Sequence, residues 1–154
     1  MMIRPAQLQD IPALESLLEK ILQVHHVGRP DIFRESGQKY SQADLTSMIG
    51  NPDQLIFVYE TAGQVVGHLF CQIQEAQSQV LQPVKTLFID DLCVSSQVRG
   101  QGIGKELYAF ALSYAKESGC YNITLDVWAY NTKAVAFYEQ LGLKQQKIRM
   151  EEVL

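Results

Sequence analysis

The chain has 154 residues, the length of one ordinary domain that can bury a core without disulfides or metal ions. Seventeen acidic residues against thirteen Lys and Arg give a formal net charge of −4, which argues against a nucleic-acid-binding surface. Three scattered cysteines in apolar stretches argue against a disulfide or zinc framework, and no segment resembles a signal peptide or a bilayer span. We therefore expect a single domain over residues 1–154, in the cytoplasm, with no nucleic-acid or membrane partner.

The N-terminal part is predicted to begin with a strand and a long helix. Residues 1–6 fit a short strand, and residues 10–26 repeat apolar side chains at helical spacing behind Asp10, a residue type that caps helices. Residues 27–41 contain Gly and Pro without a sustained period, which predicts a loop, and a short helix is expected near residues 41–52.

Three β-rich runs follow, at residues 54–61, 64–76 and 84–94. The turn around Gly63 between the first two is short, so these two runs are expected to pair as an antiparallel hairpin.

The C-terminal part alternates helices and strands. A helix is predicted from residue 103 to Gly119, a strand over 121–129, a helix over 131–142, and a last strand over 143–154. The apolar stripe of the first helix consists of Ile103, Leu107, Phe110, Ala111 and Tyr114. The resulting order, β-α-α-β-β-β-α-β-α-β, predicts an α/β domain of the α+β type with a mixed, largely antiparallel sheet.

Glycines alternate in the string VRGQGIGK, between a predicted strand and a predicted helix. A P-loop is excluded because Glu106, not Ser or Thr, follows the Gly-Lys pair. A dinucleotide fingerprint fits poorly, because Gly100, Gly102 and Gly104 are spaced by two. The pattern still suits a backbone that approaches an anion at a helix start, with Arg99 adding a positive charge. A glycine-rich turn without a ligand is the alternative.

The stretch VSSQVRGQGIGKELYAFALSYAK resembles the acetyl-coenzyme A (acetyl-CoA) signature of the GNAT superfamily of N-acetyltransferases. The signature reads Gln or Arg, two residues, Gly, one residue, then Gly or Ala, and Arg99, Gly102 and Gly104 match it. The resemblance extends over residues 84–143, from FIDDLCV to NTKAVAFYEQLGL. It implies the acyl-CoA N-acyltransferase fold, with four helices around six to seven strands that are splayed between the fourth and fifth.

The resemblance also implies acetyl-CoA as the cofactor. Pantetheine would pair with the backbone of the strand before the loop, and the N–H of Val94 would polarise the thioester carbonyl. One position implied for the cofactor, Asn131, has an alternative role as the N-cap of the helix that follows it. The cofactor-binding positions that the resemblance implies are Leu92, Val94, Arg99, Gly100, Gln101, Gly102, Ile103, Gly104, Lys105, Asn131, Ala134, Phe137 and Tyr138.

Acetyl transfer to an amine needs an acid and a base. An alkylammonium has a pKa of roughly 10.4, so a proton must be removed before attack, and the leaving thiolate must be protonated. The resemblance implies Tyr138 as the acid, with a core-facing aromatic as the alternative. Asp90 is our first candidate for the base, and period-two alternation places it on the face of Leu92 and Val94, opposite Asp91. A bulge would reverse that parity, and a water relay or a structural pairing of either carboxylate is equally open.

The acceptor wall is expected after the first helix. His25 and His26 do not indicate a metal, because adjacent histidines point to different sides of a helix and no Cys or acidic cluster accompanies them. The expected acceptor-binding residues are His25, His26, Phe33, Tyr40 and Trp128.

The predicted activity is transfer of acetyl from acetyl-CoA to an amine by direct attack in a ternary complex. Polyamines, aminoglycosides and peptide amines are all compatible acceptors, since an acidic chain suits a cation. A non-catalytic acetyl-CoA sensor or interaction module is the alternative, and a homodimer is expected because the resembled family often forms one.

Overall fold

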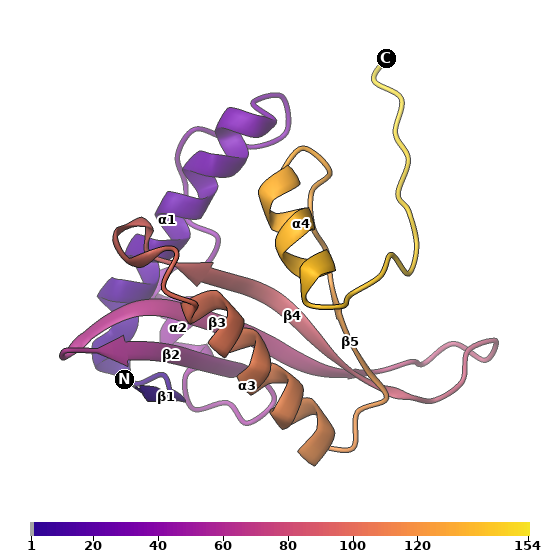
Figure 1. The fold of residues 1–154 in the computed structure, drawn as a ribbon, viewed down its shortest axis with the longest axis horizontal. Coiled ribbons are helices and arrows are strands. Elements are labelled where there is room, and N and C mark those ends of the chain that lie inside the picture. Colours follow the sequence, from indigo (N-terminus) through magenta and orange to yellow (C-terminus); the bar gives the residue numbers. More distant parts are fainter. Residues whose placement is uncertain (1) are drawn as a thin grey trace.

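The structure is a computed structural model that describes residues 2–154 as one mixed five-stranded sheet with four α-helices and two short 3-10 turns (Figure 1). Residue 1 of the predicted first strand lies outside the described residues. The elements are β1 Met2–Pro5, η1 Leu8–Asp10, α1 Ile11–Gly28, α2 Gln42–Met48, β2 Leu55–Thr61, β3 Gln64–Glu75, β4 Lys85–Val94, η2 Ser96–Val98, α3 Ile103–Glu117, β5 Asn122–Leu125 and α4 Thr132–Gln140.

The sheet has the order β1-β2-β3-β4-β5. Neighbours from β1 to β4 are antiparallel, and β4 and β5 are parallel, so the predicted mixed sheet and the β2–β3 hairpin are confirmed. The α+β class with four helices is confirmed as well.

Two apolar layers hold the helices on opposite faces of the sheet. Residues of α1 and α2, such as Leu14 and Leu45, pack with Phe70 on one face. The predicted stripe of α3 packs on the other face, where Leu107 and Ala111 are fully buried, and Figure 1 shows α3 crossing this face. Helix α4 follows β5 and lies beside it (Figure 1).

The predicted number of six to seven strands is wrong for the described residues, which form five. Residues 143–154 form no strand, although their apolar and long side chains predicted one. The physical reason is the lack of a neighbour, because a strand needs a ladder partner and this segment leaves the body of the molecule (Figure 1).

Strand β5 is shorter than the predicted run of residues 121–129. It ends at Leu125, where its pairing with Ile89 of β4 also ends. Trp128 therefore lies in a loop and not at the end of a strand.

The β2–β3 hairpin turns through Ala62 and Gly63, with Thr61 opposite Gln64. Both turn residues are left-handed, with φ of 50° and 74°. Such turns prefer Asn-Gly, because Asn tolerates this conformation better than Ala. We expect Ala62→Asn to raise the free energy of unfolding by about 0.5–1 kcal/mol, measured by urea denaturation, and Ala62→Val to lower it. Equal stability of all three proteins would contradict the turn assignment.

Candidate active site

The glycine loop connects β4 to α3. Gly100 and Gly102 are both left-handed, with φ of 83° and 80°, and Gly102 is the N-cap of α3. A Cβ added at either position would meet nothing within 4 Å, so these glycines are required by the backbone and border open space. The first N–H groups of α3 have no partner within the helix, which makes this end suitable for an anion.

The other expected loop positions differ in what they can offer. The side chain of Ile103 is buried in the core, which leaves only its backbone for a ligand. Gly104 lies inside α3, and a Cβ there would approach Phe137 Cζ to 3.2 Å, so this glycine allows α4 to pack closely. The side chains of the remaining three positions are exposed: Arg99, Gln101 and Lys105.

Strand β4 is paired on both sides over only part of its length. It pairs with β5 from Thr86 to Ile89, whereas it pairs with β3 as far as Val94. Beyond Ile89, no strand of residues 2–154 pairs with the β5-side edge of β4. The pairing pattern agrees with the predicted parting of the fourth and fifth strands and leaves the backbone near Leu92 and Val94 available.

A bulge in β4 corrects the predicted orientation of Asp90. Asp91 lies opposite Phe70 and Ile89 lies opposite Cys71, so Asp90 is the extra residue. The bulge turns both carboxylates toward the face covered by α1, while Leu92 and Val94 pack toward α3. Asp90 therefore shares a face with Asp91, not with Leu92 and Val94.

Lys39 binds both carboxylates. Its Nζ lies 3.3 Å from an Asp90 oxygen and 3.5 Å from an Asp91 oxygen. The Lys39 side chain is 44% exposed, whereas that of Asp91 is only 10% exposed. Sequence reasoning missed Lys39, because a lysine in an irregular loop carries no signal of a long-range partner. The two carboxylates thus form a pair that accepts a primary ammonium.

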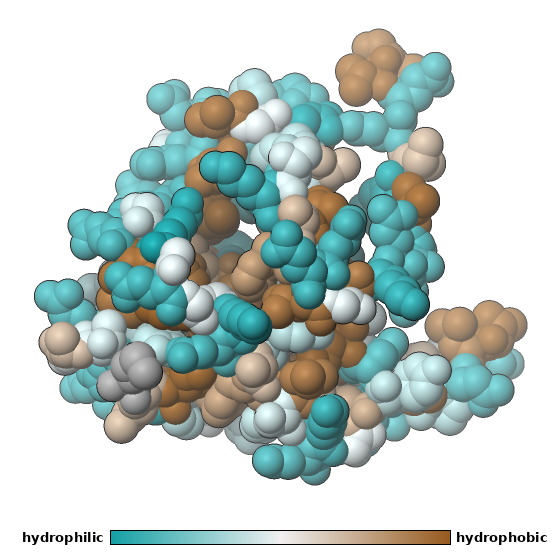
Figure 2. Space-filling model, viewed as in Figure 1, coloured by the Kyte–Doolittle hydropathy of each residue, from teal (hydrophilic) through white to brown (hydrophobic). Residues whose placement is uncertain are grey.

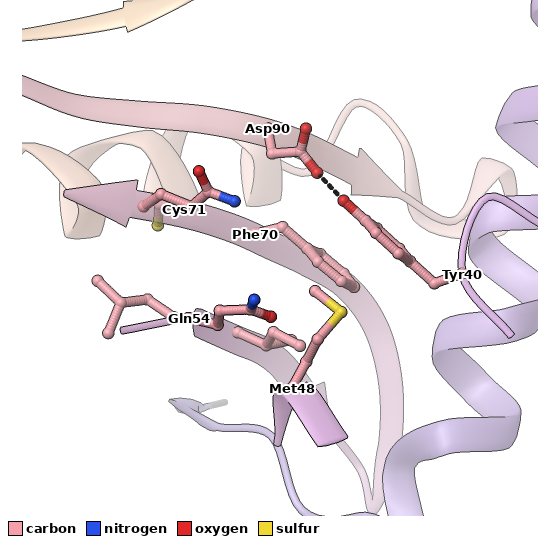
Figure 3. Close-up of a pocket in the computed structure, with 9 residues that line it drawn as sticks. Tyr40, Met48, Gln54, Phe70, Cys71 and Asp90 are labelled. Atoms are coloured by element: carbon pink, nitrogen blue, oxygen red, sulfur yellow. Dashed lines mark hydrogen bonds between the residues drawn. The ribbon is translucent and has the colours of Figure 1, made fainter. Parts of the chain in front are cut away.

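Tyr40 closes one side of this pair. Its hydroxyl donates a hydrogen bond to Asp90 Oδ2 at 2.5 Å, and its ring is stacked on Phe70 at 5.6 Å between centroids. Figure 3 shows the phenol pointing at Asp90 over a small pocket that also includes Met48. Burial raises the pKa of Tyr40, and the hydrogen bond to Asp90 raises it further. Tyr40 therefore remains a protonated donor.

His68 supports Asp91 from within the sheet. The His68 side chain is fully buried, and its Nε2 lies 3.2 Å from Asp91 Oδ1. Burial by itself would raise the pKa of Asp91, but the hydrogen bond and charge of His68, together with Lys39, hold it below its usual range. His68 Nδ1 is buried without a hydrogen-bond partner among the described residues. Asp91 is thus an ionised, fixed anion.

Tyr138 of α4 lies within the electrostatic influence of Asp91. Burial raises the pKa of Tyr138 to about 12, and the charge of Asp91 contributes to the shift. A phenol of this kind keeps its proton at neutral pH. Burial likewise raises the pKa of Cys93 to about 12, so its thiol is unsuited to nucleophilic attack.

Four aromatic rings form a second group. His25 is stacked on Phe33 at 4.7 Å, and Phe33 meets Trp128 edge to face at 5.1 Å. His25 Nδ1 is hydrogen-bonded to the Tyr130 hydroxyl. Burial lowers the pKa of His25. The charge of Asp91 raises this pKa and that of Lys39 lowers it, both by less, so these two charges reach the aromatic group.

Two expected site residues have local structural roles. His26 Nδ1 lies 2.8 Å from the Phe33 carbonyl oxygen and fixes the loop after α1. Asn131 accepts a hydrogen bond from Ala134 N at 3.3 Å, as the N-cap of α4. Neither role places a side chain on the carboxylate pair.

Within residues 2–154, no three His, Cys, Asp or Glu side chains are grouped so as to hold a metal ion. None of the described helices is long and apolar enough to cross a membrane.

Comparison with known proteins places this chain in a family. The model of the acetyltransferase (GNAT) family matches residues 18–143, and the chain belongs to that family. The crystal structure of a mutant protein from Bacillus halodurans has a TM-score of 0.95 and 29% identity, and the match covers 100% of this chain and 99% of that one.

Two further known proteins are similar, one in sequence and one in fold. N-acetyltransferase family 8 member 2 of Rattus norvegicus is 33% identical over 106 residues, which are 67% of this chain and 44% of the relative. An aminoglycoside N-acetyltransferase, AAC(6')-Iy in complex with CoA, has a TM-score of 0.74 at 15% identity, with 99% of this chain and 98% of that chain covered. The chain matches about half the length of the curated relatives.

Proposed function

We propose that this protein transfers the acetyl group of acetyl-CoA to a primary amine by direct attack in a ternary complex. The observation that carries the proposal is the position of the Lys39 ammonium, 3.3 and 3.5 Å from the carboxylates of Asp90 and Asp91. A carboxylate pair that binds one primary ammonium is suited to bind that of an acceptor. The net charge of −4 favours a cationic acceptor in the same way.

The glycine loop fits the pyrophosphate of acetyl-CoA. Gly100 and Gly102 border open space in front of the α3 N-terminus, and the exposed side chains of Arg99 and Lys105 supply positive charge. When bound, acetyl-CoA supplies the acetyl group as a thioester. The unpaired edge of β4 near Val94 suits the extended pantetheine chain, and the Val94 N–H is a donor for the thioester oxygen.

Tyr138 is the proposed acid. Its hydroxyl keeps its proton at neutral pH because burial raises its pKa to about 12. It can donate that proton to the departing thiolate and regain one from the water that takes up the proton of the acceptor, which would assist release of the coenzyme as a free thiol.

Asp91 is proposed to anchor the acceptor ammonium, with Asp90 beside it. The lowered pKa of Asp91 makes its carboxylate a strong anchor and a weak base. We therefore assign removal of the acceptor proton to a water molecule held by this carboxylate. The aromatic group of His25, Phe33 and Trp128 is proposed to line the acceptor path.

The alternative is an acetyl-CoA-binding sensor or interaction module. The same Lys39 contact favours it, because a chain whose own ammonium permanently fills the carboxylate pair would bind the cofactor without turning over an acceptor.

Release of free thiol from acetyl-CoA distinguishes the two functions. The assay uses a panel of polyamines, aminoglycosides, amino acids and Lys-containing peptides, with calorimetry to measure binding of the coenzyme. Acceptor-dependent release above background hydrolysis supports the enzyme. Coenzyme binding with no release across the panel would favour the sensor, and no coenzyme binding would refute both.

Removing the Lys39 ammonium is expected to improve binding of a cationic acceptor. Ion pairs of this exposure contribute up to about 1 kcal/mol, which corresponds to about a five-fold lower KM in Lys39→Met. Lys39→Arg retains the charge and serves as the control, with KM expected close to wild type. A higher KM in Lys39→Met would show that Lys39 assists the acceptor and does not compete with it.

A further inference from the structure

Lys39 is held in place by the residue that follows it. Tyr40 donates a hydrogen bond to Asp90 Oδ2 and stacks its ring on Phe70, which ties this end of the loop between α1 and α2 to the sheet. The Lys39 Nζ lies 5.5 Å from the centroid of the Tyr40 ring and 3.3 Å from Asp90 Oδ2. Among the lysines of residues 2–154, Lys39 is the one whose ammonium pairs with a carboxylate. Its position over the carboxylate pair is therefore set by the fold of the loop.

The Lys39 ammonium lies beside the open part of β4. Asp90 and Asp91 follow Ile89, the last residue of β4 that pairs with β5, so the ammonium lies at the stretch whose β5-side edge is unpaired. Figure 2 shows the surface hollowed between α1 and α4, the helix that carries Tyr138. Burial, and next the charge of Asp91, raise the pKa of Tyr138, so the carboxylate pair and the proposed acid act on one another. Lys39 thus occupies the place proposed for the ammonium of an acceptor.

The Lys39 side chain has room to carry an acetyl group. It is 44% exposed, and it lines a cavity of about 480 Å³ between α1 and the loop before α2. Tyr40 and the α1 residues Glu15 and Ser16 line the same cavity. A longer, neutral side chain at position 39 can therefore turn away from the carboxylate pair without displacing the core.

We propose that the protein acetylates its own Lys39 and that this modification vacates the carboxylate pair for an external cationic acceptor. The inference rests on the proposed acetyl transfer, with Lys39 as the first amine in the acceptor position. A group that the fold holds in place reacts at an effective concentration far above that of a dissolved amine. The chain is then its own first substrate.

The reaction balances as it does for any primary amine. The Lys39 ammonium gives one proton to a water molecule held by Asp91, and its nitrogen then forms an amide bond to the acetyl carbon while the carbon–sulfur bond breaks. The nitrogen releases a second proton as it becomes an amide. Of these two protons, one replaces the proton that Tyr138 gives to the departing thiolate, and the other remains in solvent. The Lys39 side chain loses its positive charge.

Loss of this charge changes what the carboxylate pair binds. The Asp91 side chain is only 10% exposed, and without the Lys39 ammonium its remaining charged or chargeable neighbour among the described ion pairs is His68. A poorly solvated carboxylate that has lost its cation favours a replacement cation. An external ammonium is therefore expected to bind more tightly after Lys39 is acetylated.

Site-resolved mass spectrometry tests the modification on the full-length protein. The protein is incubated with isotope-labelled acetyl-CoA, which separates new modification from any acquired in cells, and is then digested with a protease that cleaves after Glu. We expect Lys39 to gain label at least about ten-fold faster than Lys116 of α3 and Lys144. These two lysines are the matched controls for chemical acetylation, because both are exposed and neither pairs with a carboxylate of residues 2–154.

Dilution and Tyr138→Phe identify the source of the label. Transfer within one chain gives a rate constant that stays the same when the protein is diluted about ten-fold. Tyr138→Phe is expected to slow labelling of Lys39 and to leave labelling of Lys116 unchanged. A Lys39 rate equal to that of Lys116, a rate constant that falls on dilution, or a Lys39 rate unaffected by Tyr138→Phe would overturn self-acetylation.

An added amine separates this inference from the proposed function. Spermidine is included in the same incubation and its acetylation is followed by mass spectrometry. Acetylated spermidine with no label at Lys39 above the Lys116 background overturns the inference and leaves the proposed function standing. Label in neither spermidine nor Lys39 overturns both.

Calorimetry without acetyl-CoA tests the consequence for binding. Lys39→Gln carries a neutral amide in place of the ammonium, and Lys39→Arg keeps the charge as the matched control. Titration with spermidine is expected to show about five-fold tighter binding to Lys39→Gln than to the wild type, and nearly wild-type binding to Lys39→Arg. Binding to Lys39→Gln that is no tighter than to the wild type would overturn the claim that acetylation vacates the carboxylate pair.

Discussion

Tyr138→Phe is expected to lower kcat for acetyl transfer by at least about 100-fold while the affinity for the coenzyme stays near that of the wild type. The substitution removes one hydroxyl and keeps the ring, so packing in α4 is retained. The hydroxyl matters because it is the proposed proton donor to the departing thiolate, and burial keeps it protonated at neutral pH, with a pKa of about 12. The measurement combines steady-state thiol release with calorimetric titration of the coenzyme.

Tyr108→Phe provides the matched control for this variant. Tyr108 lies on α3, and burial raises the pKa of its phenol as well. It is assigned no part in proton transfer, and its effect on the pKa of Tyr138 is the smallest of those that raise it. Its kcat is expected to stay within about two-fold of the wild type. If Tyr138→Phe changed kcat no more than Tyr108→Phe, or weakened the coenzyme as strongly as it slowed turnover, Tyr138 would be a packing residue.

Asp91→Asn is the second large effect that we expect. The change removes the buried anion that His68 and Lys39 stabilise, and kcat/KM for a cationic acceptor should fall by about 100-fold, within the range for loss of a buried charged partner. Asp90→Asn should cost less, because Asp90 is the more exposed of the two and retains a hydrogen bond with Tyr40. Equal losses for the two variants would contradict the assignment of Asp91 as the main anchor.

Asp91→Asn is also expected to change how the free energy of unfolding depends on pH. The pKa of Asp91 is lower in the folded protein than in the unfolded chain, where it is about 3.9. Its contribution to stability is therefore present above pH 3.9 and is lost as the pH falls through the folded value. Urea denaturation from pH 7 to pH 3 should show a smaller acid loss in Asp91→Asn than in the wild type.

Most of the fold could be predicted from the sequence, because the patterns that indicate its helices and turns involve neighbouring residues. The apolar stripe of α3 and the short turn at Gly63 each predict an element from neighbouring residues, and both elements are present. The prediction of a last strand was wrong because period and composition cannot indicate whether a neighbouring strand is present to pair with it. The segment 143–154 has β-branched and long side chains that suit a strand, but the described chain supplies no strand that pairs with it.

The candidate site could be predicted less well from the sequence, because its geometry depends on contacts between residues far apart in the chain. The bulge at Asp90 has no local signature when the extra residue is one of two identical aspartates, so alternation placed this residue on the wrong face. Lys39 meets the carboxylates from an irregular loop about fifty residues earlier in the chain, which no spacing rule indicates. Gly104 matches a phosphate-binding pattern, yet its structural contact is with Phe137.

The most direct test of the proposed activity is mass spectrometry of acceptors incubated with acetyl-CoA and the protein. Each primary amine is paired with its N,N-dimethylated analogue, which keeps the positive charge but cannot retain an acetyl group in a stable amide. The proposal predicts a single added acetyl group on a primary amine, none on its analogue, and loss of the product in Tyr138→Phe. An unmodified panel with coenzyme bound, or acetylation that does not depend on the protein, would contradict it.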